Sequence, residues 1–184
     1  LDEVAEQTIA FLLACARGIC HFDRHVRAGG WDLKTGMPMF RVKGKTLGLY
    51  GFGKIGETVA GKAAALGLNV IFYSLVYDKE AADACGARYV EMDELVEKSD
   101  FLSLHAPLTS DTEKIINEQV LEGMKEGAFL INTARGGLVD LDALYAALVN
   151  NRIAGAAVDV FVPERYPADN PILQLDNFIS APHV

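Results

Sequence analysis

A glycine-rich turn between a strand-like run and a helix-like run constrains this chain more than any other feature. The apolar stretch 46–50 leads into residues 51–56, Gly-Phe-Gly-Lys-Ile-Gly, a G-x-G-x-x-G pattern, and residues 57–66 then read as a helix. Gly51 permits a tight turn, Gly53 lets a pyrophosphate approach the backbone, and Gly56 allows close packing of helix on strand. A helix that begins here also offers free N–H groups to phosphates. This setting favours a dinucleotide site over a glycine turn that binds nothing.

Composition favours a globular α/β protein with a substantial core. The 184 residues are 51% hydrophobic, which suits one domain with a small arm. The formal net charge of -8 argues against a nucleic-acid partner or an anionic membrane. No apolar run is long enough to cross a bilayer, and no signal peptide opens the sequence. Because the chain begins at Leu1 rather than Met, we expect a fragment of a longer protein.

Cysteine usage points to a reducing compartment. The three cysteines, Cys15, Cys20 and Cys85, form no C-x-x-C pair. An odd number without metal spacing is typical of buried thiols in the cytosol. We therefore expect a cytoplasmic protein without a metal site, and a redox role for these thiols is the weaker alternative.

Strand and helix patterns alternate along the chain. Residues 5–20 form a long apolar helical segment, and the polar residues 21–39, broken by glycines and Pro38, predict an arm with one short helix. Strands are predicted at 46–50, 69–73, 88–90, 100–104, 128–131, 154–158 and 178–180, and helices at 57–66, 79–85, 93–98, 117–124 and 140–150. Continuous apolar strands are typical of a parallel sheet covered by helices on both faces. We predict an α/β Rossmann fold, a doubly wound parallel sheet, in residues 41–184, with residues 1–40 as a helix and arm.

Polar residues follow the predicted strands at the edge where such sheets bind ligands. These segments are 73–75, 105–109, 132–137, 159–164 and 181–184. Because the carboxyl ends of parallel strands meet at one edge, we expect these segments to converge on one crevice.

Several blocks resemble the D-isomer-specific 2-hydroxyacid dehydrogenases. The blocks are VAEQTIAFLLACAR (4–17), the 51–56 loop, LSLHAPLT (102–109), INTARGGLVD (131–140), AAVDVFVPE (156–164) and NPILQLDNFISAPHV (170–184). They occur in the family's order and span almost the whole chain. The resemblance implies the nucleotide-binding domain of an oxidoreductase that transfers hydride between NAD(H) and a small 2-hydroxy or 2-keto acid.

The resemblance also implies a catalytic trio. Arg135 would bind the substrate's carboxylate and keto oxygen, because a guanidinium can donate two parallel hydrogen bonds. His183 would give a proton to the carbonyl oxygen as hydride arrives and take it back in the reverse direction. Glu164 would hydrogen-bond the histidine and fix its tautomer. Taken singly, each could instead be a solvated loop or surface residue.

A further set of residues would hold the cofactor if the family pattern applies. Those expected around the pyrophosphate and the pocket wall are Gly51, Gly53, Lys54, Ile55, Gly56, His105, Pro107 and Thr112. Those expected beside the nicotinamide are Thr133, Ala134, Arg135, Asp159 and His183. Asp159 would accept a hydrogen bond from the carboxamide; the alternative is a turn residue at a strand end.

The end of the second predicted strand departs from the usual NAD pattern. NAD-preferring members place an acidic residue there to pair with the ribose hydroxyls, and this chain has Ser74. Serine can bind a ribose but does not repel a 2′-phosphate. No arginine follows to attract one, and Asp78 comes too late unless a loop returns it. We expect NAD as the cofactor, with NADP left open.

The resemblance implies a substrate domain built from two segments, one before the opening helix and one after the final histidine, and we expect both to lie outside this sequence. The resemblance therefore leaves the particular 2-hydroxy acid unidentified, and the isolated chain is expected to turn over slowly or not at all. Arg165 stands where the family commonly has proline, and we expect it to face solvent. The opening helix region packs in a two-fold dimer in the family, so we expect residues 1–40 to form a homodimer contact; the alternative is a helix that covers its own domain.

The sequence is also compatible with two other kinds of protein. One is an NAD(H)-sensing corepressor of the same fold, which can retain the trio. The other is a formate or phosphite dehydrogenase of the same superfamily. Formate-oxidising relatives have glutamine in place of the glutamate, so Glu164 argues against the second hypothesis.

Overall fold

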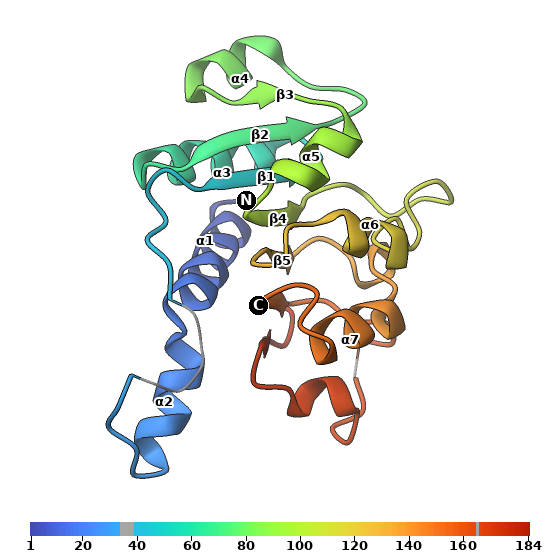
Figure 1. Cartoon of the computed structure of the whole chain (residues 1–184). Helices are drawn as coiled ribbons and strands as arrows, with labels where there is room; N and C mark the ends of the chain where they lie inside the picture. The colour runs from blue at the N-terminus through green and yellow to red at the C-terminus, as the bar shows by residue number, and fades with distance from the viewer. Residues whose placement is uncertain (34–38, 165) are drawn as a thin grey trace.

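The computed structural model describes residues 1–33, 39–164 and 166–184. Within these residues, seven parallel strands form one sheet in the order β3-β2-β1-β4-β5-β6-β7 (Figure 1). The strands are β1 (Thr46–Tyr50), β2 (Asn69–Tyr73), β3 (Arg88–Tyr89), β4 (Phe101–Leu104), β5 (Phe129–Asn132), β6 (Gly155–Val158) and β7 (Phe178–Ser180). Each corresponds to a predicted strand, with small differences at the ends. The doubly wound Rossmann fold is confirmed.

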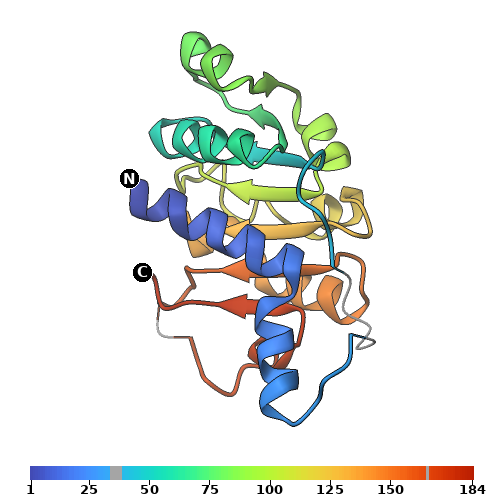
Figure 2. The same ribbon diagram turned by 90° about the vertical axis from the view of Figure 1, so that its left-hand side faces the viewer.

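Helices cover both faces of the sheet (Figures 1 and 2). They are α1 (Asp2–Arg17), α2 (Ile19–Arg27), α3 (Lys54–Ala65), α4 (Lys79–Cys85), α5 (Met92–Lys98), α6 (Glu118–Gly123) and α7 (Leu141–Val149), with 3₁₀ turns η1 (Gly136–Leu138) and η2 (Pro171–Gln174). One core packs α1 and α3 on the sheet through residues such as Leu12, Val59 and Phe129. The other packs α5, α6 and α7 on the opposite face. No helix in the described ranges is both long and apolar enough to cross a bilayer.

The predicted unbroken helix over residues 5–20 is wrong. Gly18 adopts the left-handed conformation, with φ 61°, and ends α1, so α2 starts in a new direction at Ile19. Glycine reaches this conformation without steric cost, and it commonly ends helices for that reason. The apolar pattern continues across the break, which concealed it.

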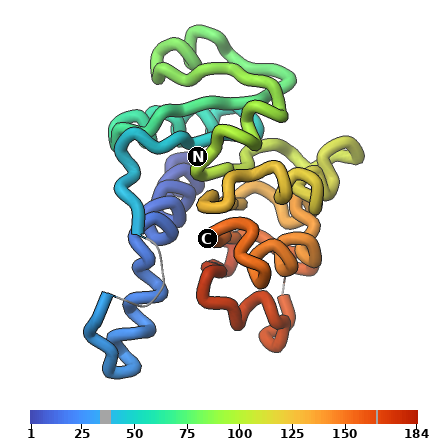
Figure 3. Tube along the Cα trace, in the orientation of Figure 1, coloured from blue at the N-terminus to red at the C-terminus, as the bar shows by residue number. Residues whose placement is uncertain are grey.

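α2 and the segment after it project from the body of the molecule (Figures 1 and 3). None of the residues of α2 is buried. The side chains of Ile19, Val26 and Trp31 are largely exposed, Trp31 to 88%. The end of the predicted arm (34–38) and Arg165 lie outside the described residues.

The order of the strands determines where a ligand can enter. β1 pairs with β2 on one side and with β4 on the other. The chain runs outward from β1 through β2 to β3, then returns to β4 and continues in the opposite direction. Open α/β sheets bind ligands at such a reversal, beyond the carboxyl ends of the strands. Both ends of the chain lie on the side toward which β6 and β7 run (Figure 2).

Candidate functional site

The glycine loop after β1 has two glycines that the fold needs and one that it does not. Gly51 has φ 98°, and a Cβ there would lie 2.7 Å from the backbone nitrogen of Ala106. A Cβ at Gly56 would lie 2.8 Å from the carbonyl oxygen of Gly51. At Gly53, by contrast, a Cβ would meet no described atom within 4 Å. The space over Gly53, at the start of α3, is therefore open for a ligand to reach the backbone.

A cavity of about 470 Å³ lies at the reversal point between β1 and β4. Residues after β1, β2 and β4 line it, among them the predicted site residues Gly51, Gly53, Ser74, His105, Pro107 and Thr112. Gly56 and Ile55 lie in the first turn of α3 behind the loop, where Ile55 packs on the core beneath. Lys54 lies outside the lining and pairs with Glu57 at 3.2 Å. The cavity has the place and the open glycine that a dinucleotide needs.

The end of β2 presents a neutral surface to this cavity. The Ser74 hydroxyl donates to the carbonyl oxygen of Val76 at 2.7 Å. Leu75 and Val76 complete the wall and are strongly exposed. The Asp78 carboxylate accepts from the backbone N–H groups of Glu80 and Ala81 at 2.9 and 3.2 Å, so it caps α4. The loop therefore does not return Asp78 to the cavity.

His105 and Thr112 shape the opposite wall. The His105 ring lies with Nε2 2.9 Å from the hydroxyl of buried Ser103. The residue keeps some exposed surface at the cavity, yet desolvation lowers the pKa of His105 to about 4. The imidazole is therefore neutral at neutral pH and contributes no positive charge. The Thr112 hydroxyl donates to the carbonyl oxygen of Pro107 at 2.7 Å and accepts from the N–H of Thr109 at 2.8 Å, which closes this loop.

A second cavity, of about 270 Å³, lies beyond the ends of β6 and β7. Asp159, Glu164 and His183 all line it. His183 Nδ1 lies 3.2 Å from Glu164 Oε1, with the two side chains 52% and 78% exposed. The structure thus places the predicted histidine and glutamate within hydrogen-bond distance of each other.

Asp159 anchors the segment that carries this histidine. Its side chain is 3% exposed, and Oδ1 accepts from the backbone N–H groups of His183 and Val184 at 3.0 and 3.3 Å. His183 itself has φ 61°, an unusual conformation for a residue with a side chain. The buried carboxylate holds the backbone in this position. Its predicted contact with a carboxamide stays a prediction.

A turn at the end of β5 contains the predicted residues Thr133, Ala134 and Arg135. Asn132, which is not among the predicted site residues, holds this turn. The buried amide of Asn132 donates to the carbonyl oxygen of Arg135 at 2.9 Å and accepts from the N–H of Ala134 at 3.0 Å. Such an asparagine turn after an apolar strand is a signal that the sequence does contain.

Arg135 is exposed and points its guanidinium at the carbonyl oxygen of Ala134, at 2.6 Å. Within the described part of the chain it does not line either of the two cavities. Its turn nevertheless packs on the segment between Asp159 and Glu164, because a Cβ at Gly136 would lie 2.5 Å from the backbone of Phe161. The turn that carries Arg135 therefore lies beside the segment that leads to Glu164, while the guanidinium itself bonds to Ala134.

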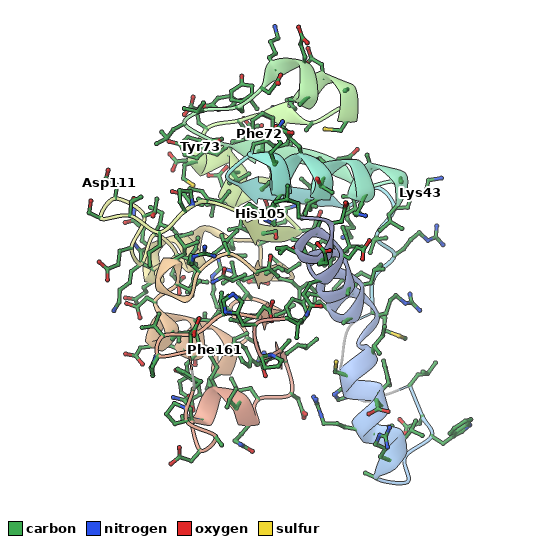
Figure 4. The ribbon with its side chains drawn as sticks, turned by 180° about the vertical axis from the view of Figure 1, so that it is seen from behind. Lys43, Phe72, Tyr73, His105, Asp111 and Phe161 are labelled. Carbon is green, nitrogen blue, oxygen red and sulfur yellow. The ribbon has the colours of Figure 1, made fainter. Side chains whose placement is uncertain are left out.

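The two cavities occupy the same edge of the sheet. In Figure 4, Tyr73 lies above His105 and His105 lies above Phe161, which follows the order of β2, β4 and β6 in the sheet. The described residues contain no group of three or more His, Cys, Asp or Glu side chains placed to hold a metal ion. This edge therefore offers a glycine loop, a histidine–carboxylate pair and a nearby arginine.

Comparisons with known proteins agree with this geometry. The family model "D-isomer specific 2-hydroxyacid dehydrogenase, NAD binding domain" matches residues 9–184. A glyoxylate reductase of Korarchaeum cryptofilum is 42% identical over 185 residues, which cover 99% of this chain and 56% of that protein. The chain thus spans about half the length of the curated relatives of this kind.

Two solved structures extend the comparison. The D-lactate dehydrogenase with NAD+ from Lactobacillus jensenii has a TM-score of 0.89 and 31% identity, over 98% of this chain and 58% of that one. An acyclic imino acid reductase in complex with NADPH and D-Arg has a TM-score of 0.86 and 40% identity, over 98% and 56%. The chain therefore belongs to the D-isomer-specific 2-hydroxyacid dehydrogenase family, within which it matches the NAD-binding domain.

Proposed function

We propose that the intact protein containing this chain transfers hydride between NAD(H) and a small 2-hydroxy or 2-keto acid. The observation that carries the proposal is the 3.2 Å contact between His183 Nδ1 and Glu164 Oε1, at the same sheet edge as the open glycine loop. The names of the glyoxylate reductase and D-lactate dehydrogenase relatives support this substrate class. A bound NADH supplies the hydride.

In this proposal each residue of the trio has one task. Glu164 holds Nδ1–H of His183, so that Nε2 is left to face the substrate and pass a proton to the carbonyl oxygen. Arg135 binds the carboxylate and the same oxygen, which gains negative charge as hydride arrives. Buried Asp159 keeps the histidine segment in place. In oxidation, His183 takes the hydroxyl proton instead.

The direct test uses the intact protein with glyoxylate, hydroxypyruvate and pyruvate, each with NADH and with NADPH. We expect NADH oxidation with at least one of these 2-keto acids. Tight NADH binding without turnover of any of them would favour the corepressor alternative. No observation on the described residues favours that alternative, and the glyoxylate reductase and D-lactate dehydrogenase relatives carry the names of enzymes.

Cofactor choice follows from the bonding of Ser74. Its hydroxyl hydrogen is donated to Val76, so its oxygen can accept from a ribose 2′-hydroxyl, and the neutral side chain brings no positive charge to attract a 2′-phosphate. We expect Ser74→Asp to raise the ratio of NADH to NADPH affinity by about tenfold, because a carboxylate also repels the phosphate. Calorimetry with both cofactors measures the ratio, and Ser74→Ala is the neutral control. An unchanged ratio in Ser74→Asp would remove this residue from the ribose site.

We also propose a homodimer formed through residues 1–40. Its support is the exposed apolar surface of α2 and the segment after it, which includes Val26 and Trp31. Val26→Glu should convert the dimer to a monomer in light scattering, since a charge would be buried at the contact. Val149→Glu on α7 is the matched control, because both valines are 48% exposed. A monomeric parent protein at micromolar concentration contradicts the proposal.

A cytoplasmic location completes the proposal. Its support in the described residues is that Cys15, Cys20 and Cys85 carry free thiols. Fractionation of cells that produce the intact protein tests it.

A further inference from the structure

A buried pair of hydroxyl groups joins α1 to the turn that carries Arg135. Thr8 Oγ1 lies 2.8 Å from Thr133 Oγ1. Thr8 is fully buried, and Thr133 is 7% exposed. Thr8 comes from the middle of α1, and Thr133 is the first residue after β5. The contact therefore ties a helix on one face of the sheet to the site at its edge.

The direction of this hydrogen bond follows from the number of hydrogens. The Thr8 hydroxyl also lies 2.9 Å from the carbonyl oxygen of Val4, which can only accept. The single hydrogen of Thr8 is therefore donated to Val4, and Thr133 must donate to Thr8. Both hydrogens are assigned, so the side chain of Thr133 is held in one rotamer.

Thr133 lies within the turn, and other contacts hold the residues on both sides of it. Asn132, its neighbour, bonds to the backbone of Ala134 and Arg135. Gly136, on the other side, packs on the backbone of Phe161. Thr8 adds a constraint from the α1 side. The side chain of Arg135 is long and its guanidinium is exposed. The position of the guanidinium therefore depends on how firmly the backbone of this turn is held.

We propose that Thr8 is a positioning residue, which acts through Thr133 to hold the turn that presents Arg135. The inference rests on the proposed function, in which Arg135 binds the substrate. Helix stability alone does not explain why a threonine stands at position 8. A threonine hydroxyl that donates to a carbonyl oxygen of its own helix does not stabilise that helix. A valine would fill the same volume against β5.

Thr8→Val tests the inference, since it removes the hydroxyl and keeps the shape. It leaves the buried Thr133 O–H without its acceptor, so we expect kcat/KM for the 2-keto acid to fall about tenfold. NADH affinity should stay within about twofold, because the glycine loop is untouched and Thr133, which is expected beside the nicotinamide, is itself retained. Thr8→Ser, which keeps the hydroxyl, should restore kcat/KM to within about twofold of wild type.

Thr58→Val in α3 is the matched control. The Thr58 hydroxyl makes the same bond to its own helix, to the carbonyl oxygen of Lys54 at 2.8 Å. This variant should keep wild-type kcat/KM. A loss in Thr8→Val no larger than in Thr58→Val, or an equal loss in Thr8→Ser, overturns the inference.

Amide hydrogen exchange gives a readout that does not need turnover. In the intact protein, Thr8→Val should speed exchange in peptides covering 132–138 while peptides covering 10–16 keep their wild-type rates. Unchanged exchange at 132–138 overturns the inference even if activity falls. If the wild-type protein reduces no 2-keto acid, the proposed function fails, and exchange at 132–138 alone decides the role of Thr8.

Discussion

His183→Ala should lower kcat of the intact protein by about 10²–10⁴-fold, the usual loss when the acid–base group is removed. The imidazole is the proton donor in the proposed reaction, and Glu164 Oε1 at 3.2 Å holds it in place. The side chain is 52% exposed, so its removal opens no hole in the core. The bond from the His183 N–H to Asp159 uses backbone and remains. NADH fluorescence titration should therefore show nearly unchanged binding.

Two comparison variants separate the roles within the trio. Glu164→Gln keeps a hydrogen-bonding group beside the ring but removes the charge that stabilises the imidazolium, so its loss should be intermediate. Arg135→Ala should raise KM and lower kcat together, because the carboxylate and the developing oxyanion lose the same partner. Wild-type turnover in His183→Ala would remove the histidine from the mechanism.

Gly53→Val should weaken NADH binding by about 100-fold or more, because its side chain would occupy the approach of the pyrophosphate to the backbone. The fold should tolerate the change. Gly53 has φ -96° and ψ -164°, an extended conformation that valine adopts readily, and its Cβ would contact no described atom within 4 Å. Calorimetry measures the affinity, and thermal unfolding checks the fold.

The control for this prediction is Gly61→Val, the same substitution further along α3. Gly61 also has open space within 4 Å in the described structure. NADH affinity should be unchanged there. Equal affinities for Gly53→Val and the wild type would show that the pyrophosphate lies elsewhere. Gly51→Val is less informative, because its side chain would strike the backbone of Ala106 and disturb the sheet itself.

Local patterns were enough to predict most of the fold. The strands are continuous apolar runs between polar segments. The predicted ends of each strand therefore lie close to the observed ends. The break at Gly18 was missed because the apolar spacing continues from α1 into α2. The 3₁₀ turns η1 and η2 were missed because three or four residues carry no periodicity.

The site was predictable only where a motif or the family resemblance reached it. The glycine loop has its own pattern, and the resemblance pointed to Glu164 and His183 as partners. The sequence alone could not predict whether the Asp78 carboxylate lies at the ribose site. The same carboxylate can bind a ligand or cap the N–H groups of α4, and in the structure it caps α4. The contact between Thr8 and Thr133 joins residues 125 positions apart, and no local sequence pattern predicts it.

The position of α1 also affects how a new chain acquires its structure. α1 comes early, yet it packs on β5 and β6, and its residues Phe11 and Leu12 share a core with Phe129 and Ala157. Thr133 follows Thr8 by 125 residues, which takes roughly 6–25 s at ribosomal speeds of about 5–20 residues per second. α3 emerges earlier and can cover part of α1, but the part of α1 that packs on β5 and β6 has no partner on the nascent chain until those strands are made. The domain completes its core only when β7 has also emerged, because Ile172 and Phe178 belong to that core.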